Sequence, residues 1–236
     1  MTYEITVLRR KTPEDLPYEQ TFRYEARTGA DTVASALINI NRGSLTDVNG
    51  NKAEPIAWEC SCLQKKCGAC AMVINCIPRL ACDSVLSAVA ADDRIRLEPL
   101  RKFPAVRDLI CDRSVMRENL KTITAWIDEE VSLKDDKDNI LFEAGKCLQC
   151  GCCLEVCPNF YAEGRFFGMN AMVPVAGLLE KLPADKSRGL RKKYSKHIYA
   201  GCAKSLACHD ICPAGLDIEK LLVNSNAIAL WKHLFK

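Results

Sequence analysis

Five of the chain's 15 cysteines lie in one stretch, Cys147-Leu-Gln-Cys150-Gly-Cys152-Cys153-Leu-Glu-Val-Cys157-Pro158. With Cys152 set aside, the stretch reads C-x2-C-x2-C-x3-C-P. Three thiolates on one tight loop can each reach a different iron of a cubane, and the longer x3 step directs the fourth thiolate away from it. The proline ends the loop and removes a backbone donor. This spacing favours iron–sulfur ligation over a structural zinc site or a disulfide.

A second stretch repeats the frame. It reads Cys202-Ala-Lys-Ser205-Leu-Ala-Cys208-His-Asp-Ile-Cys212-Pro213. In two-cluster runs of the bacterial ferredoxin type, the last cysteine of each run ligates the other cluster. One cluster is therefore predicted to take Cys147, Cys150, Cys153 and Cys212, and the other to take Cys157, Cys202 and Cys208.

Ser205 stands where the second run should have its second cysteine. Four thiolates suit a [4Fe–4S] cluster, whereas three suit a [3Fe–4S] cluster, which is a cubane without one corner. Two other readings of Ser205 stay open: it caps a helix, or its alkoxide holds a fourth iron. Oxygen is a poor substitute for thiolate at such a site. We predict [4Fe–4S] at the first site and [3Fe–4S] at the second.

The composition is that of a soluble globular protein, with 48% hydrophobic and 27% charged residues in 236. A net charge of +3 does not point to nucleic acid. No apolar run approaches 18 residues, so no membrane span of its own is expected. The first residues, Met-Thr-Tyr-Glu-Ile, lack a basic and apolar run, so no secretory leader is expected. Many cysteines without a leader fit thiolates that stay reduced in a cytosol and bind metal.

The first 105 residues predict two strands followed by a helix, the beginning of a β-grasp domain. Residues 3–9 and 20–26 alternate as half-buried strands do, with a loop between them. Thr28 or Asp31 is the expected helix cap. The apolar face of the helix is formed by Val33, Ala34, Leu37 and Ile40.

A separate group of cysteines follows that helix. Counted from Cys62, it has the spacing C-x4-C-x2-C and then x11-C, which is the plant-type [2Fe–2S] spacing. The predicted ligands are Cys62, Cys67, Cys70 and Cys82. Residues 71–75 and 94–97 are expected to finish the sheet. The four remaining cysteines are predicted to be buried or unused thiols; these are Cys60, Cys76, Cys111 and Cys152.

The rest of the chain reads as helix and loop around the two later cysteine runs. Residues 101–107 are expected to be a connector and Asp108–Val131 a helix. Residues 135–138 are expected to be a solvated loop. An amphipathic helix should end the chain, with an apolar face formed by Ile218, Leu221, Leu222, Ile228 and Leu230.

A plant-type [2Fe–2S] domain followed by a two-cluster domain with one missing ligand resembles the iron–sulfur subunit of succinate dehydrogenase or fumarate reductase. Local stretches agree as well, among them Cys67-Gly-Ala-Cys-Ala-Met, Arg79-Leu-Ala-Cys82, Phe103-Pro-Ala-Val-Arg-Asp-Leu, Cys157-Pro-Asn and Cys212-Pro-Ala-Gly-Leu. The resemblance implies an α+β chain. Residues 1–105 would form a β-grasp, plant-type ferredoxin domain, and residues 106–236 an all-α, bacterial-ferredoxin-like domain.

The resemblance also implies partners. A flavoprotein subunit with FAD interconverts succinate and fumarate, and a membrane anchor, in many members with haem b, exchanges electrons with quinone. This chain would be the electron-transfer subunit between them, with no substrate catalysis of its own. Its expected place is peripheral, on the cytoplasmic side of the membrane.

Three positions depart from the ubiquinone-linked members. Ala203 replaces a histidine and Ala162 a tryptophan of the quinone pocket, and Asn159 replaces a usual serine. These changes favour a menaquinone-linked branch. Lys65 also stands where the family has a glycine, which predicts a differently shaped [2Fe–2S] turn.

Two further interpretations compete with this one. The chain could serve a soluble complex whose flavoprotein works with a thiol/disulfide or nicotinamide partner. Alternatively, its clusters could be structural or act as sensors, although three clusters of graded type argue for electron transfer.

Overall fold

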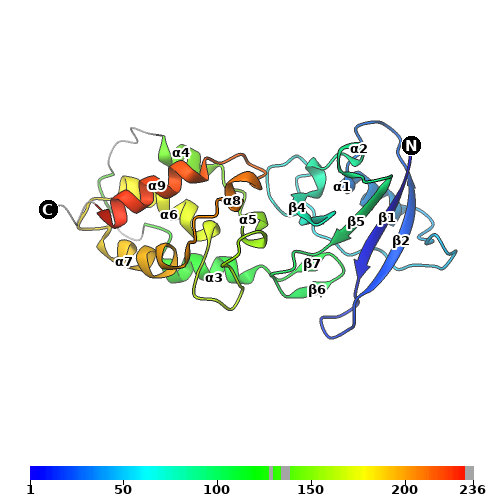
Figure 1. Ribbon diagram of the computed structural model, residues 1–236, viewed down its shortest axis with the longest axis horizontal. Helices are drawn as coiled ribbons and strands as arrows, with labels where there is room; N and C mark the ends of the chain where they lie inside the picture. Colours follow the sequence, from blue (N-terminus) through cyan, green and yellow to red (C-terminus); the bar gives the residue numbers. More distant parts are fainter. Residues whose placement is uncertain (128–129, 134–138, 232–236) are drawn as a thin grey trace. The chain divides into compact units, whose positions relative to one another are not determined.

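The computed structural model describes residues 1–127, 130–133 and 139–231. The chain divides into two compact units, Met1–Asp112 and Arg113–Lys236 (Figure 1). The predicted domains are residues 1–105 and 106–236. Which clusters each of them binds stays a prediction.

The first unit is built on a five-stranded mixed sheet with the order β2-β1-β5-β3-β4. β1 pairs with β2 antiparallel and with β5 parallel, and β3 pairs with both β5 and β4 antiparallel. The strands are β1 (Thr2–Arg9), β2 (Tyr18–Glu25), β3 (Ala71–Ile74), β4 (Ile77–Leu80) and β5 (Arg94–Glu98). The predicted strands are confirmed; β4 was not predicted.

The first two strands form because their apolar residues alternate. Tyr3, Ile5 and Val7 point to the core and are at most 2% exposed, and Ile5 lies opposite buried Phe22. On the other face, the hydroxyls of Thr6 and Thr21 hydrogen-bond at 2.9 Å. The period of two thus places one face of the hairpin in the core.

Helix α1 (Val33–Arg42) buries the predicted apolar face, but its predicted cap was wrong. The cap is Thr32, whose hydroxyl accepts from the Ser35 amide, while the Ser35 hydroxyl accepts from the Thr32 amide. Asp31 is used elsewhere, because its carboxylate accepts from the Tyr24 hydroxyl and from Thr28. These two bonds hold Asp31 one residue outside the helix.

The predicted helix over Asp108–Val131 was also wrong at both ends, because α3 spans only Ser114–Ile123 and residues 124–127, 130 and 131 are not helical. Before it, β6 (Ala105–Arg107) and β7 (Ile110–Cys111) form a small hairpin. Between those strands, buried Asp108 bonds the Arg9 side chain at 2.9 Å and the amide of Ala57 at 2.8 Å. Asp108 therefore belongs to the first unit, where it ties β1 to the segment that precedes the first cysteine group.

The first unit also contains two short helices, η1 (Ala81–Asp83) and α2 (Leu86–Val89).

The second unit packs around α6 (Met169–Lys181), which is buried along most of its length and packs against α4 and α9. The other elements are α4 (Ile140–Gly145), α5 (Cys152–Glu155), α7 (Arg188–His197), η2 (Tyr199–Gly201), α8 (Ala207–Asp210) and α9 (Ile218–Ala229). In Figure 1 the short α5 and α8, which carry cysteines and contact each other, lie at one end of this helical unit. Within the described part of this unit no residue belongs to a strand.

The α+β layout is confirmed: a mixed sheet with helices precedes a helical unit. The names β-grasp and bacterial-ferredoxin-like stay predictions. The predicted C-terminal helix is confirmed as α9, which buries Ile218, Leu221 and Leu222, whereas Ile228 is half-buried and Leu230 follows the last residue of the helix. The loop expected at residues 135–138 lies outside the described residues. Across the described residues, no helix has the length and apolar character that a membrane crossing requires.

Candidate functional site

The first cysteine group lies on an exposed loop that leads into β3, together with one cysteine of η1. Cys62 and Cys67 are on the loop, Cys70 directly precedes β3, and Cys82 is the middle residue of η1. The amide of Ala81 bonds the carbonyl of Cys70 at 3.0 Å, which holds η1 against the end of the loop. The fold thus brings all four predicted [2Fe–2S] ligands to one end of β3.

Backbone amides of the loop point at the sulfurs. The amides of Gln64 and Lys66 lie 3.4 and 3.3 Å from the Cys62 sulfur, and the Lys65 amide lies 3.4 Å from the Cys82 sulfur. The first two donors lower the pKa of Cys62 to about 7. The loop therefore favours the thiolate form of Cys62 that metal binding requires, whereas burial raises the pKa of Cys70 to about 12.

Lys65 shows why a glycine suits this position. Its φ is 58°, in the left-handed region that favours glycine, and this conformation accompanies the approach of its amide to Cys82. Its ammonium group pairs with Asp83 at 2.7 Å, and both side chains are partly exposed. A lysine thus adopts the glycine-like turn, at a backbone strain of about 1–2 kcal/mol.

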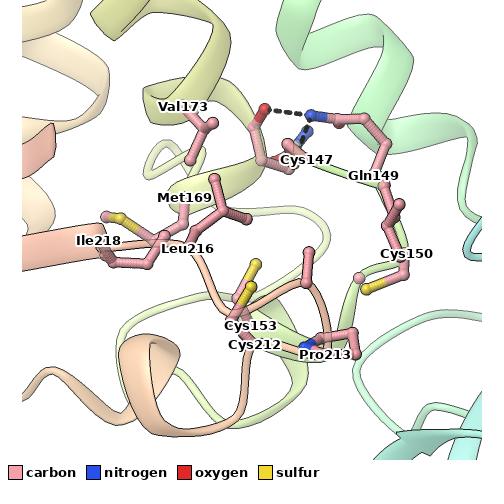
Figure 2. Close-up of a pocket in the computed structure, with 14 residues that line it drawn as sticks. Cys147, Gln149, Cys150, Cys153, Met169, Val173, Cys212, Pro213, Leu216 and Ile218 are labelled. Atoms are coloured by element: carbon pink, nitrogen blue, oxygen red, sulfur yellow. Dashed lines mark hydrogen bonds between the residues drawn. The ribbon is translucent and has the colours of Figure 1, made fainter. Parts of the chain in front are cut away.

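The second cysteine group lines a cavity in the helical unit. Cys147, Cys150, Cys153 and Cys212 all contribute to its wall, together with apolar residues of α6 and α9 (Figure 2). Burial raises the pKa of Cys147 and raises that of Cys153 well above its usual value, with the neighbouring thiolates adding to both shifts. Cys212 comes from the second run, so the two runs meet at this cavity as the crossed ligand pattern predicts.

The third group joins the other members of the two runs. Burial, together with the nearby thiolates of Cys157 and Cys202, raises the pKa of Cys208 to about 11. The two runs are also tied by the Asn159 side chain, which donates to the Gly201 carbonyl at 2.6 Å. The three cysteines predicted to hold the second cluster of this unit therefore lie close together.

Ser205 is exposed and does not cap α8, because the cap position is Leu206. The interpretation of Ser205 as a helix cap is therefore wrong. Its hydroxyl has the same place in the second run that Cys150 has in the first.

The four spare cysteines differ from one another. Cys60 and Cys76 are exposed and Cys111 is buried in β7. Cys152 is fully buried and donates its thiol proton to the Cys150 sulfur, which holds the pKa of Cys150 at about 7. Cys150 also has its backbone carbonyl bound by Arg113 at 3.0 Å. Sequence reasoning did not find these contacts of Cys150.

The donor set fits iron–sulfur clusters, because thiolates are their usual ligands. Among the residues that the structure describes, no group of three or more His, Cys, Asp or Glu side chains could hold a single metal ion. Thiolates of a cluster surround several irons and so stand farther apart than ligands of one ion. The ligand sets themselves stay predictions.

Comparisons with known proteins cover nearly the whole chain. Residues 4–118 match the family described as "2Fe-2S iron-sulfur cluster binding domain", and residues 143–216 match "4Fe-4S dicluster domain". The succinate dehydrogenase iron–sulfur subunit of Bacillus subtilis is 33% identical over 236 residues, which cover 95% of this chain and 91% of that protein. The fumarate reductase iron–sulfur subunit of Escherichia coli is 29% identical over 72% of each chain.

A solved structure is similar in fold. A chain of the Mycobacterium smegmatis Sdh1 complex in the apo form has a TM-score of 0.74 at 19% identity, covering 98% of this chain and 97% of that one. At this identity the likeness speaks for the fold alone.

Proposed function

The chain belongs to the family of iron–sulfur subunits of succinate dehydrogenases and fumarate reductases, and from this premise we propose that it transfers electrons between a flavoprotein subunit with FAD and a quinone-reactive membrane anchor. Like its relatives, it is a component of an oxidoreductase complex. We propose no substrate catalysis on this chain itself.

The observation that carries the proposal is the crossing of the two cysteine runs. Cys212 lines the cavity of Cys147, Cys150 and Cys153, while Cys157 neighbours Cys202 and Cys208. A structural zinc site closes one compact ligand set and has no need of such an exchange. When bound, iron–sulfur clusters accept and release single electrons.

The proposed ligand sets follow the three groups. Cys62, Cys67, Cys70 and Cys82 would hold [2Fe–2S]; Cys147, Cys150, Cys153 and Cys212 would hold [4Fe–4S]. Cys157, Cys202 and Cys208 would hold [3Fe–4S], with Ser205 leaving one corner without a thiolate. The exposed loop supplies amide donors to the first set, whereas apolar residues of α6 and α9 exclude water from the second.

We propose that the flavoprotein docks against the N-terminal part of the chain and the anchor against residues beyond 150. This places the chain peripherally on the cytoplasmic side of the membrane. The order rests on the family resemblance and on the position of the three-iron motif late in the chain. Cross-linking that joined the flavoprotein mainly to residues beyond 150, and the anchor to residues 1–100, would overturn it.

A menaquinone-type anchor, with haem b, is the favoured partner. Ala203 is exposed and Ala162 is half-buried, and neither methyl side chain can donate a hydrogen bond to a quinone oxygen. The same two residues also support the alternative, a soluble complex with a thiol/disulfide or nicotinamide partner. Neither of those partners would need a quinone pocket on this chain.

Purification of the intact complex decides between the two. We expect a flavoprotein, a haem-containing anchor and bound menaquinone, identified by mass spectrometry, a haem spectrum and quinone extraction. A stable complex without anchor or haem would favour the soluble alternative. Low-temperature EPR of the oxidised complex should show a three-iron signal; full iron content without that signal would contradict the proposed role of Ser205.

A further inference from the structure

The side chain of Gln149 lines the cavity that holds the proposed ligands Cys147 and Cys150, and it points toward Cys147 (Figure 2). Its amide nitrogen lies 3.3 Å from the Cys147 sulfur and 3.0 Å from the backbone carbonyl of Asn170. Both distances are within hydrogen-bonding range for their atom types, because sulfur accepts at longer range than oxygen. One side-chain amide thus bridges a ligand sulfur and the first turn of α6.

The Cys147 sulfur and the Asn170 carbonyl decide whether the NH2 group or the oxygen of the Gln149 side chain faces them. A thiolate and a backbone carbonyl can only accept, and an NH2 group has two hydrogens to donate. The reverse orientation would put the Gln149 carbonyl oxygen against both acceptors. In the observed orientation that oxygen is buried without a hydrogen-bond partner among the described residues. An unpaired buried oxygen is costly, so the two donated bonds must outweigh it.

The support of Gln149 is rigid. Asn170 is 1% exposed, and its own side chain donates to the Met116 carbonyl at 3.2 Å, which ties α6 to α3. Gln149 itself has φ 50°, a left-handed conformation that costs free energy for any residue with a side chain. Such a conformation persists where the surroundings determine it, here through bonds at both amide hydrogens.

We propose that Gln149 is a positioning residue that acts through Cys147 to raise the reduction potential of the cluster held there. The proposal rests on the proposed function, because it needs Cys147 as a ligand of [4Fe–4S]. Reduction adds negative charge to the cluster and its thiolates, and an N–H donor bonds the more negative state more strongly. Hydrogen bonds to the sulfurs are among the factors that set cluster potentials.

The test is a redox titration of the intact complex, followed by EPR of the reduced [4Fe–4S] cluster, in Gln149→Leu and Gln149→Glu. Leucine has a similar size but cannot donate, so it removes both bonds of the Gln149 amide. In this variant we expect the equilibrium constant for reduction of the [4Fe–4S] cluster to fall about tenfold. For one electron this lowers the midpoint potential by about 59 mV. Glutamate adds negative charge at the same place, and we expect a shift at least as large in the same direction.

The chain offers a matched control, because the tripeptide Cys-Leu-Gln also occurs at residues 62–64. There the donor to the sulfur is the backbone amide of Gln64, and the side chain is exposed. Gln64→Leu keeps that amide, so the midpoint of the [2Fe–2S] cluster should stay unchanged within error.

The outcomes separate this inference from the proposed function. An unchanged [4Fe–4S] midpoint in an iron-replete Gln149→Leu complex overturns the inference alone. Retention of the [4Fe–4S] signal in Cys147→Ala overturns the proposed ligand set. If Gln149→Leu loses the cluster, Gln149→Lys decides: it keeps an N–H donor and adds positive charge, so a midpoint below that of the unaltered complex refutes the proposal.

Discussion

The two loops that begin with Cys-Leu-Gln share a tripeptide but not a conformation. At residues 62–64 the left-handed residue is Leu63, with φ 53°; at residues 147–149 it is Gln149, with φ 50°. In both loops the backbone amide of the glutamine bonds the first cysteine, but only at Cys147 does the glutamine side chain donate to the sulfur as well.

The surroundings of the two thiols also differ. Residues 63–67 are exposed, and backbone amides lower the pKa of Cys62 to about 7. Cys147 lines a cavity closed by α6, and burial raises its pKa. The exposed loop thus stabilises the Cys62 thiolate with its backbone, while the buried loop adds donors from its own side chains, Gln149 to Cys147 and Cys152 to Cys150. The predictions below test this difference.

The largest difference is expected between variants of two adjacent cysteines of the buried loop, Cys153 and Cys152. Cys153→Ala should lose the [4Fe–4S] cluster, because it removes a proposed ligand. Cys152→Ala should keep the iron content, because the Cys152 thiol only donates to Cys150. Iron analysis and EPR of the purified complex measure both. Loss of a cluster in Cys152→Ala would show that the ligand register is wrong.

Ser205→Cys should change the cluster type in the second run. A fourth thiolate restores the spacing C-x2-C-x2-C-x3-C, so the site should convert from [3Fe–4S] toward [4Fe–4S] and its potential should fall. The oxidised three-iron EPR signal should decrease as iron content rises. Ser205→Ala is the control and should leave the signal as it is; an unaltered signal in the cysteine variant would argue against the crossed ligand pattern.

Asp108→Ala should destabilise the scaffold of the exposed loop. Asp108 and Arg9 are each at most 3% exposed, and removing one partner leaves a buried charge, which costs about 3–5 kcal/mol. Denaturant unfolding, followed by the visible circular dichroism of the [2Fe–2S] cluster, measures the loss. The control is Glu54→Ala, which removes exposed pairs with Lys11 and Arg107 and should cost less than about 1 kcal/mol. Equal effects would refute the role of burial.

The smallest effect concerns the lysines of the exposed loop. Lys65→Gln leaves Asp83 unpaired next to Cys82, so the [2Fe–2S] midpoint should fall. At an effective dielectric of about 20, a charge at roughly 8 Å contributes about 2 kcal/mol, and solvent screening reduces this to about 1 kcal/mol or less. Redox titration at low and high salt measures the shift. The double variant Lys65→Gln, Asp83→Asn should restore the midpoint; if neither Lys65→Gln nor Lys66→Gln lowers the midpoint below that of the unaltered complex, these charges do not tune the cluster.

Two helices show how far the local sequence pattern predicts the structure. The apolar face of α9 was predicted in part: Ile218, Leu221 and Leu222 are buried, but Ile228 is half-buried and Leu230 lies beyond the last residue of the helix. The segment after Asp108 has helical period too, yet its first residues form a turn and strand, because Asp108 is bound by Arg9 and Ala57. The ion pair between Arg9 and Asp108 therefore overrides the local helical propensity of this segment. No spacing in the sequence predicts that ion pair.

Cysteine spacing alone defined the proposed ligands, since loop ligation of a cluster is a local geometric constraint that a few residues satisfy. The same kind of local constraint produced the strand alternation of β1 and β2. Only the tertiary structure decided which groups donate to the ligand sulfurs. Cys152 and Gln149 act as donors because packing buries one against Cys150 and holds the other against Asn170. Identical tripeptides therefore have different roles, because backbone conformation at a left-handed residue depends on the surrounding fold rather than on its neighbours in sequence.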